Sequence, residues 1–398
     1  MNFPIMHVFG GVRAYKMANS LANHGLNVIQ VALEPTRNFD DYLSHEKIRV
    51  IGKFQQLYAK VKGKRLGIFK LHFLLYPLFL RLIVDIIRKN RVQLIHAHRH
   101  TGAALVLLAK KLFGLKVKVI FDYHDPLELE DVPNPGAFRK LLISLFYSLE
   151  RWICKNADFV ITQGEEHDEL LKARHNISMQ KLDHFYNPVD ITVYYPKKSL
   201  AVKKRYGLSN NTVLFLGSII DSFGIHNLIL AAPKIIAEIK DVKFAIRGVV
   251  QSQQYHEKLV HMIKERGLTE NFIWLPYMST NELVELISSC EMGVILHVKG
   301  SLITETAIPN KIFEYMACGI PTVANNLPNL RRFIPDGYSG ILCDTDNPEE
   351  LASVLISLLK NRAVGAKIGR NARKLAVEKY NWGIECDKLL KMYNKMLV

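Results

Sequence analysis

The segment 308–324, IPNKIFEYMACGIPTVA, holds the residue types and spacing best suited to binding an anionic ligand. It predicts a loop, a helix that ends at Gly319, and a buried strand that begins at Pro321. Backbone N–H groups at the helix start and the ammonium of Lys311 suit a diphosphate, and the carboxylate of Glu314 suits the two hydroxyls of a ribose. The structural alternative is that Glu314 only stabilises the first helical turn, by about 0.3–1 kcal/mol.

Two strands predicted in the first half of the chain are followed by histidines. His124 comes shortly after the strand 117–121, and His96, His98 and His100 end the strand before it. Ligands of open α/β sheets bind at the carboxyl ends of strands, and histidine exchanges a proton near neutral pH. These histidines therefore line a cleft or, alternatively, cap a loop and are solvated. With no cysteine or carboxylate at ligand spacing, they do not indicate a metal.

A glycine pair, Gly10 and Gly11, directly precedes the amphipathic segment 12–24. Two residues without a Cβ allow backbone N–H groups and the helix start to approach a phosphate or another negatively charged oxygen. The alternative for such a pair is a tight turn that binds no ligand.

Apolar runs rich in β-branched residues alternate with amphipathic helical segments along the chain. This alternation predicts parallel strands joined by crossover helices, which is the pattern of a doubly wound α/β fold. A polar, lysine-containing stretch at 195–208 separates two such sets, so we predict two domains in tandem. The predicted strands are 28–33, 94–97, 117–121 and 159–162 in the first set, and 212–216, 242–246, 272–275, 292–297, 321–324 and 340–343 in the second.

The composition excludes several classes of protein. A chain of 398 residues is long enough for two domains, and 49% hydrophobic against 23% charged residues rules out disorder of the bulk. The five cysteines form no C-x-x-C pair, which predicts neither a disulfide framework nor a zinc ribbon and fits a reducing compartment. Residues 1–22 contain no secretory signal, and the interrupted apolar window 71–87 is too short to span a membrane.

The charge of the chain favours anionic partners. There are 53 Lys and Arg against 37 Asp and Glu, a net charge of +16, and between Lys47 and Lys118 there are 17 basic residues and one acidic residue. Basic residues flank the apolar segment 71–80, as in a helix that lies on an anionic membrane surface. The alternative is a buried crossover helix with solvated lysines. The flanking residues are Lys60, Lys62, Lys64, Arg65 and Lys70 before the segment and Arg81, Arg88, Lys89 and Arg91 after it.

The segment 308–324 resembles the donor-site signature of retaining GT-B glycosyltransferases of glycosyltransferase family 4. Other segments resemble elements of that family, in the family's order and over nearly the whole chain. They are Gly10-Gly11, 94–98, 123–125, NPVD at 187–190, Leu216-Gly217, GYSGIL at 337–342 and YNW at 380–382. The resemblance implies an α/β GT-B fold, in which two doubly wound Rossmann-like domains face each other across a cleft. It places the acceptor on residues 1–195, with a returning C-terminal helix at 377–398, and the nucleotide-sugar on residues 196–376.

The resemblance also implies transfer of a sugar from a nucleotide-sugar donor to an acceptor hydroxyl, with retention and with no metal or other cofactor. With the basic surface, it suggests a lipid-linked or other saccharide acceptor in surface polysaccharide or glycoconjugate synthesis. We then expect a cytoplasmic protein at the inner face of the membrane that binds no nucleic acid. The implied residues are His124 and Gly11 for catalysis; Gly217, Gly248, Ile308, Pro309, Asn310, Lys311 and Glu314 for the donor; Glu305 for its sugar; and Gly10, Arg13, His98, Lys62, Lys64 and Arg65 on the acceptor and membrane side.

The chain departs from the family pattern in three places that affect the site. The two glutamates of the family usually have seven residues between them, whereas Glu305 and Glu314 have eight, so Glu314 fits the ribose better than Glu305 fits the sugar. Only nine residues precede Gly10, so the first strand is expected to be short, irregular or missing. Ser218 and Phe223 stand where most members have an arginine and a lysine for the donor diphosphate. That clamp is therefore either rebuilt with Lys311 or weakened.

Two other functions fit the same residues. A nucleotide-sugar epimerase on this fold would use the same ribose glutamate but would need further acid and base carboxylates. A non-catalytic protein that binds nucleotide-sugars or a membrane surface would bind the donor without turnover. Assays of the free donor without acceptor, and of donor binding across an acceptor panel, separate these alternatives.

Overall fold

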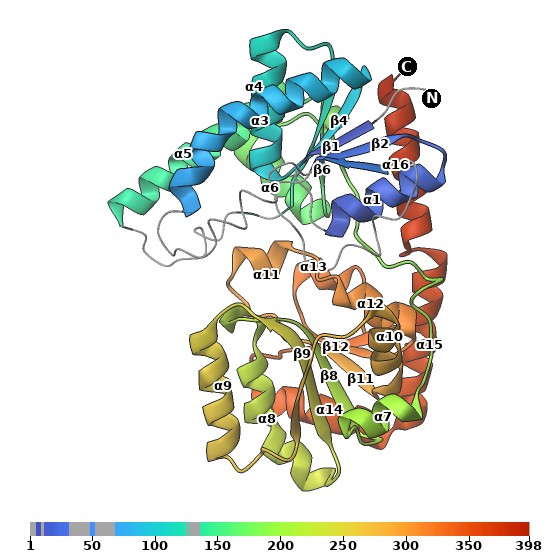
Figure 1. Cartoon of the computed structure of the whole chain (residues 1–398). Coiled ribbons are helices and arrows are strands. Elements are labelled where there is room, and N and C mark those ends of the chain that lie inside the picture. Colours follow the sequence, from blue (N-terminus) through green and yellow to red (C-terminus); the bar gives the residue numbers. More distant parts are fainter. Residues whose placement is uncertain are drawn as a thin grey trace. The chain divides into compact units, whose positions relative to one another are not determined.

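The computed structural model describes residues 5–8, 12–31, 48–51, 68–124, 126 and 136–397. The chain forms two compact units (Figure 1). Unit 1 comprises Met1–Tyr186 and Cys386–Val398, and unit 2 comprises Asn187–Glu385. Residues 187–195 and 377–385, which the sequence analysis assigns to the N-terminal domain, group with unit 2 in this division.

Unit 1 contains a parallel sheet of seven strands in the order β3-β2-β1-β4-β5-β6-β7. The first strand is present, although it is only four residues long, and it pairs with β2 on one side and β4 on the other. The strand order reverses at this point, and the carboxyl ends of strands at such a reversal form the usual ligand site of open α/β sheets. The strands are β1 (Ile5–Val8), β2 (Val28–Val31), β3 (Ile48–Ile51), β4 (Leu94–His98), β5 (Lys118–Asp122), β6 (Phe159–Thr162) and β7 (Leu182–His184).

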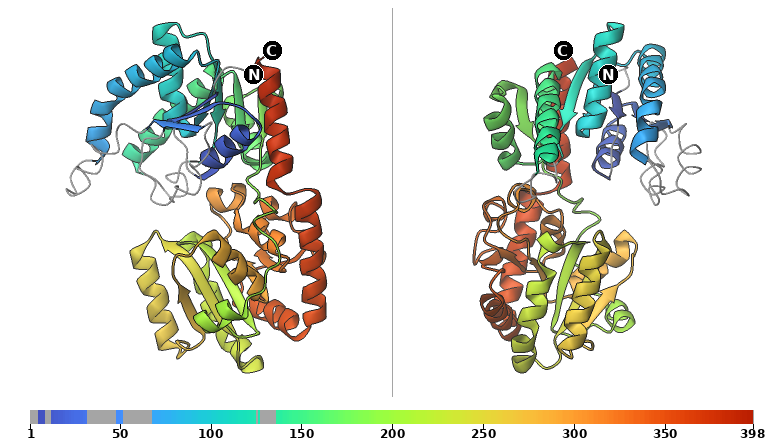
Figure 2. Two further views of the ribbon diagram at one scale, coloured as in Figure 1. Left: turned by 45° about the vertical axis from the view of Figure 1, so that its right-hand side comes forward. Right: turned by 90° about the vertical axis from the view of Figure 1, so that its left-hand side faces the viewer.

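Helices cover both faces of this sheet, as right-handed crossovers require. Helix α4 lies between α3 and α5 and contacts both, while α1 and the end of α16 lie on the other face (Figure 2). Buried apolar side chains of α3 and α4 and of the central strands form the core between these layers. The helices are α1 (Val12–Asn23), α3 (Ile68–Asn90), α4 (Arg99–Phe113), α5 (Ala137–Asn156), α6 (Glu165–His175), the 3-10 helix η3 (Met179–Lys181) and α16 (Trp382–Leu397).

The apolar segment 71–80 belongs to α3, the crossover helix between β3 and β4. In the part of it whose side chains are described, Phe79 is buried and Leu78 is 54% exposed. Farther along α3, Ile83 and Ile87 enter the core against α4. No helix in the described part of the chain combines the length and the apolar character needed to cross a bilayer. Lys60, Lys62, Lys64 and Arg65 lie outside the described residues.

Unit 2 contains a parallel sheet of six strands in the order β10-β9-β8-β11-β12-β13. Helices α8 and α14 pack together, as do α10, α12 and α15 in a second group. The strands are β8 (Thr212–Ile219), β9 (Lys243–Val250), β10 (Phe272–Leu275), β11 (Met292–Ile295), β12 (Thr322–Asn325) and β13 (Gly340–Cys343). The helices are α7 (Leu200–Tyr206), the 3-10 helix η4 (Asp221–Phe223), α8 (Ile225–Glu238), α9 (Gln253–Glu265), α10 (Thr280–Ser289), α11 (Leu302–Thr306), α12 (Lys311–Cys318), α13 (Pro328–Arg331), α14 (Pro348–Lys360) and α15 (Arg362–Glu378).

The predicted pair of doubly wound α/β domains is confirmed, and every predicted strand overlaps an observed one. The stop predicted for the helix in 308–324 is also observed: Gly319, with φ of 71°, ends α12, and β12 begins at Thr322. A left-handed backbone at this position favours glycine, because other residues would strain. Lys311 and Glu314 therefore lie in the first turn of a short helix whose end is fixed at Gly319.

Candidate functional site

Unit 1 brings four buried polar side chains together at the carboxyl ends of β4 and β5. His96 and His98 are two residues apart on β4, and their rings stack with centroids 4.4 Å apart. The sheet register places His98 beside Asp122 of β5. The Oδ2 atom of Asp122 accepts a hydrogen bond from Arg13 Nε at 3.0 Å. The same oxygen lies 2.9 Å from His98 Nδ1 and 3.2 Å from His96 Nε2.

His124 forms the more accessible edge of this cluster, at 9% exposure. Its Nε2 lies 3.4 Å from His98 Nδ1 and 3.7 Å from the Asp122 carboxylate. Its backbone carbonyl accepts a hydrogen bond from Gln163 Nε2 at 2.9 Å, which holds the loop after β5 against the end of β6. The ring of His124 therefore contacts the cluster, while its backbone is bonded to the residue that follows β6.

The Asp122 cluster is built from distant parts of unit 1. Arg13 lies at the start of α1 and also donates a hydrogen bond to the carbonyl of Tyr186, at 3.2 Å. His96 Nδ1 is hydrogen-bonded to the hydroxyl of Tyr393, which lies on the C-terminal helix α16. The C-terminal helix therefore supports the same strand ends as the first helix.

Electrostatics make Asp122 the charged centre of the cluster. Burial is the largest single influence on Asp122 and favours its protonation. The charge of Arg13 and the interactions with His124 and His96 together outweigh burial and hold the pKa of this carboxyl well below its usual range. Burial also lowers the pKa of His98, to about 3, and that of His96. At neutral pH, His96 and His98 are therefore neutral, and an Arg13–Asp122 ion pair lies beside the ring of His124.

His96, His98 and Asp122 also resemble a set of metal ligands, because one atom from each lies within 4.8 Å of the others. The guanidinium of Arg13, however, lies 3.0 Å from the carboxylate oxygen that such an ion would share. A divalent cation there would be repelled by the arginine charge. The arrangement fits an orienting hydrogen-bond network better than a metal site.

Unit 2 holds a buried ammonium at the start of α12. Lys311 is 6% exposed, and no described residue accepts a hydrogen bond from its Nζ atom. The Nζ atom lies over the rings of Phe215 and Phe223, 4.7 Å and 4.8 Å from their centroids. Burial lowers the pKa of Lys311 to about 7, although the charge of Glu314 acts in the opposite direction. A buried ammonium without a hydrogen-bond acceptor is a group that a bound anion would satisfy.

Two glycines make room beside this ammonium. Gly217, at the end of β8, has φ of 139°, and a Cβ built on it would lie 2.6 Å from Lys311 Nζ. Gly248 on β9 pairs with Gly217, and a Cβ on it would lie 2.0 Å from the Gly217 carbonyl oxygen. Because a substitution at Gly248 would meet rigid backbone, the two strand ends can approach this closely only with glycine.

Phe223 and His297 complete the surroundings of Lys311. The rings of Phe223 and His297 stack with centroids 4.4 Å apart. His297 is 2% exposed, and neither of its ring nitrogens has a hydrogen-bond partner among the described residues. Burial, and then the charge of Lys311, lowers the pKa of His297 well below its usual range. Sequence reasoning missed His297, although it follows the strand β11 just as His124 follows β5.

The two glutamates of the donor-site signature have different surroundings. Glu314 lies in the first turn of α12, and its carboxylate is 3.5 Å from the hydroxyl of Tyr194. Glu305 accepts a hydrogen bond from the backbone N–H of Gly300 at 2.8 Å, so it already stabilises its own loop. Between them, Ile308, Pro309 and Asn310 form the turn that enters α12, where Ile308 is 7% exposed.

The predicted site residues therefore fall into two sets. Unit 1 brings together Arg13, His98 and His124, while Gly10, Gly11, Lys62, Lys64 and Arg65 lie outside the described residues. Unit 2 brings Gly217, Gly248 and Lys311 into contact, with Glu314 one helical turn beyond Lys311. Asp122, Tyr393 and His297 join these sets without having been predicted as site residues.

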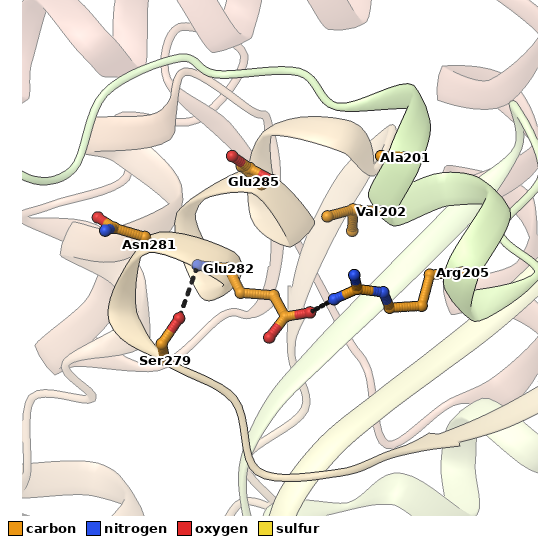
Figure 3. A pocket seen from close by; sticks show the side chains of 7 residues that line it. All are labelled: Ala201, Val202, Arg205, Ser279, Asn281, Glu282 and Glu285. Carbon is orange, nitrogen blue, oxygen red and sulfur yellow. Dashed lines mark hydrogen bonds and ion pairs between the residues drawn. The ribbon is translucent and has the colours of Figure 1, made fainter.

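A small surface pocket in unit 2 lies elsewhere, between α7 and α10 (Figure 3). Its volume is about 290 Å³. Arg205 Nη1 and Glu282 Oε1 are 2.6 Å apart within it, and Ser279 accepts a hydrogen bond from the backbone N–H of Glu282. These charged groups satisfy each other, and no predicted site residue lines the pocket, so we assign it no ligand. The lining residues are Ala201, Val202, Arg205, Ser279, Asn281, Glu282 and Glu285.

Two protein-family models match the chain, one after the other. The model described as Glycosyltransferase Family 4 matches residues 10–193. The model described as Glycosyl transferases group 1 matches residues 197–375. The two matches meet close to the boundary between unit 1 and unit 2.

Individual proteins with glycosyltransferase or synthase names are also similar to this chain. N-acetyl-alpha-D-glucosaminyl L-malate synthase of Bacillus anthracis is 22% identical over 316 residues, which cover 78% of this chain and 76% of that protein. D-inositol 3-phosphate glycosyltransferase of Mycolicibacterium vanbaalenii is 26% identical over 261 residues, 62% of this chain and 55% of that protein.

Solved structures share the fold of the whole chain. Sucrose-phosphate synthase from Thermosynechococcus elongatus has a TM-score of 0.77 and 18% sequence identity, and the match covers 99% of each chain. Anabaena HepE in complex with UDP has a TM-score of 0.74 and 16% identity, covering 99% of this chain and 100% of that chain.

Proposed function

We propose that this chain, which is a glycosyltransferase of the family 4 type with the GT-B fold, transfers a sugar from a nucleotide-sugar donor to an acceptor hydroxyl with retention. The observation that carries the proposal is the ammonium of Lys311, buried beside Gly217 with no hydrogen-bond acceptor among the described residues. A diphosphate supplies the missing negative charge. Glu314, one turn farther along α12, then reaches the ribose of the same nucleotide.

The comparisons support a nucleotide-sugar as the donor. Anabaena HepE, which shares the fold, has been solved with UDP and with UDP-glucose. The Lys311 site lies at the carboxyl ends of β8 and β9, where α/β sheets bind nucleotides. Phe223, in the place of the family's lysine, contributes an aromatic face to Lys311 instead of a second charge. The diphosphate clamp of this chain therefore depends on Lys311, Gly217 and the start of α12.

In this mechanism the protein positions the reactants and stabilises the charge that develops on the leaving diphosphate. Lys311 and the backbone N–H groups at the start of α12 stabilise that charge. The diphosphate itself helps to deprotonate the acceptor hydroxyl. The proposed catalytic residues are His124, for a hydrogen bond to the transferring sugar, and Gly11, which lies outside the described residues. Asp122, through His98, keeps the ring of His124 in one orientation. No step of this scheme uses a metal or other cofactor.

The proposed acceptor is a lipid-linked saccharide at the inner face of the cytoplasmic membrane, in surface polysaccharide or glycoconjugate synthesis. The excess of basic residues between Lys47 and Lys118 supports an anionic membrane as the place where the acceptor is met. Lys62, Lys64 and Arg65 belong to that basic stretch. Arg13 and His98 belong to unit 1, which is the proposed acceptor-binding unit.

The experiment that tests the function is a screen of UDP-, GDP- and ADP-sugars with the purified full-length protein. We expect slow hydrolysis of one donor without acceptor, and no change in the sugar configuration of the donor that remains. Release of the epimerised nucleotide-sugar would instead support an epimerase. Tight donor binding with no hydrolysis and no transfer to a panel of lipid-linked and soluble saccharides would support a non-catalytic binding protein.

Replacing His124 by alanine is expected to lower kcat by about a hundredfold or more, because a hydrogen bond to the reacting sugar is lost in the transition state. The Kd for the free nucleotide should stay the same, since His124 lies in unit 1 and the nucleotide site in unit 2. Steady-state kinetics and calorimetry measure the two constants separately.

The matched control is His100→Ala, which removes a histidine that bonds to Glu150 and not to the Asp122 cluster. This variant should lose stability but keep the kcat of the parent. An unchanged kcat in His124→Ala would show that His124 has only a structural role.

A further inference from the structure

Helix α5 carries an apolar stripe on its outer face. Phe138, Leu141, Leu142, Leu145 and Leu149 are 74%, 55%, 39%, 58% and 40% exposed. At 3.6 residues per turn, these five side chains fall within an arc of about 100°. Five large apolar side chains in one contiguous stripe are unusual on a surface that only meets water.

The last turns of α5 are anchored through residues on a different side of the helix from the stripe, so the stripe is not the packing face. Glu150, on the buried side of the helix, is 0% exposed. Its two carboxylate oxygens bond to His100 Nε2 of α4 at 2.7 Å and to His175 Nε2 of α6 at 2.6 Å. Ile153 and Cys154 of the same side enter the core of unit 1. Rolling α5 to bury the stripe would break both of these bonds and expose a buried carboxylate.

The charges of α5 indicate what covers the stripe. Its exposed charged side chains, Lys140, Arg151 and Lys155, are all basic, and its one acidic residue is the buried Glu150. On a helical wheel these basic residues flank one side of the stripe. Apolar side chains bordered by cations suit a leaflet of anionic lipid. A second copy of this helix would instead bring like charges together.

We propose that α5 lies in the interfacial region of an anionic membrane, with Phe138 and the four leucines inserted among the headgroups and Lys140, Arg151 and Lys155 paired with lipid phosphates. This inference rests on the proposed function, because it places a membrane contact on the acceptor-binding unit. It also assigns a membrane contact to helix α5, in addition to the basic region around the segment 71–80. The apolar stripe provides depth of insertion, and the basic side chains provide selectivity for anionic lipid.

The test is flotation of the full-length protein with vesicles of phosphatidylcholine, with and without phosphatidylglycerol. The parent protein should bind the mixed vesicles and not the pure phosphatidylcholine vesicles, and its binding should weaken as salt rises. The double variant L141Q/L145Q should bind mixed vesicles at least about tenfold more weakly, because two leucine side chains are no longer transferred from water into the lipid.

The control variant, L112Q/L200Q, replaces two other exposed leucines. Leu112 of α4 is 64% exposed and Leu200 of unit 2 is 85% exposed, so the control removes as much exposed apolar surface away from the stripe. It should bind vesicles like the parent. Circular dichroism and thermal unfolding establish that both double variants are folded.

Three outcomes would overturn the proposal. They are absence of vesicle binding by the parent at low salt, equal losses in the two double variants, and a dimer of the parent, seen by sedimentation velocity, that L141Q/L145Q converts to a monomer. The last result would make the stripe an interface between two copies. Calorimetry of donor binding in the same samples reports on the proposed glycosyltransferase site independently, so failure of one proposal does not imply failure of the other.

Discussion

Replacing Glu314 by alanine is expected to raise the Kd for the nucleotide-sugar by about a hundredfold or more while changing the unfolding free energy by at most about 1 kcal/mol. The carboxylate lies in the first turn of α12, where its contribution to helix stability is small. Its contribution to the donor is larger, because two ribose hydroxyls would be left without an acceptor. Isothermal calorimetry with the donor found in the screen, and thermal unfolding of the same protein, measure the two effects.

A glutamate in the first turn of another helix provides the matched control. Glu282 follows the N-cap Ser279 of α10 and bonds to Arg205, away from every predicted site residue. Glu282→Ala should therefore lose some stability and keep the parent's donor affinity. If Glu314→Ala bound the donor as tightly as the parent does, the assignment of Glu314 to the ribose would be wrong.

Replacing Lys311 by methionine is expected to weaken donor binding strongly but to stabilise the folded protein. A pKa lowered from 10.5 to about 7 means that the surroundings disfavour the charged form by on the order of 5 kcal/mol. Methionine has a similar length and keeps the contacts with Phe215 and Phe223 without that cost. We expect the unfolding temperature to rise by about 5 °C, while donor affinity falls by about a hundredfold or more.

Lys311 also makes donor binding depend on pH. Because its pKa is about 7 in the free protein, the ammonium is largely neutral above that pH and must take up a proton when a diphosphate binds. Donor affinity should therefore fall as pH rises above about 7, by up to about tenfold per pH unit. Calorimetry at about pH 8 in two buffers of different ionisation enthalpy should detect this proton uptake.

The unfolding free energy of the free protein should depend on pH in the opposite direction from donor affinity. Between about pH 7 and pH 10.5 the unfolded chain holds a proton on Lys311 that the folded protein has released, so stability attributable to this group rises with pH. Lys311→Met should remove both trends. Lys243→Met, at the amino end of β9, serves as the control and should keep them. Equal donor affinity at about pH 6.5 and 8.5, or a Lys311→Met variant that binds donor normally, would exclude Lys311 from the diphosphate site.

The sequence by itself determined the features that depend on near neighbours along the chain. Runs of β-branched residues predict the strands, because a parallel strand is buried on both faces and must be apolar throughout. The helix stop at Gly319 follows from one residue that tolerates a left-handed backbone. The spacing of Lys311 and Glu314 places them one turn apart on any helix. The doubly wound fold and the candidate donor residues were therefore predictable.

Only the tertiary structure decided which distant side chains meet. Arg13 and Asp122 are separated by 109 positions, and His96 and Tyr393 by 297. No local pattern records such a pairing, since it depends on strand order and on the return of α16. The aromatic surroundings of Lys311 arise in the same way, from β8 and the turn after it.

The exposed leucines of α5 are a further feature that the sequence alone does not predict. The periodic pattern of α5 predicts an amphipathic helix, but a helix with apolar residues over much of its circumference does not reveal which of them pack inward. The bonds of Glu150 to His100 and His175 settle this, because a buried carboxylate must face its partners. The basic residues around the segment 71–80 point to a membrane contact there, whereas the burial of Glu150 leaves the leucines of α5 exposed as well. Burial is decided by the neighbours that the fold supplies, and the sequence of one helix does not contain them.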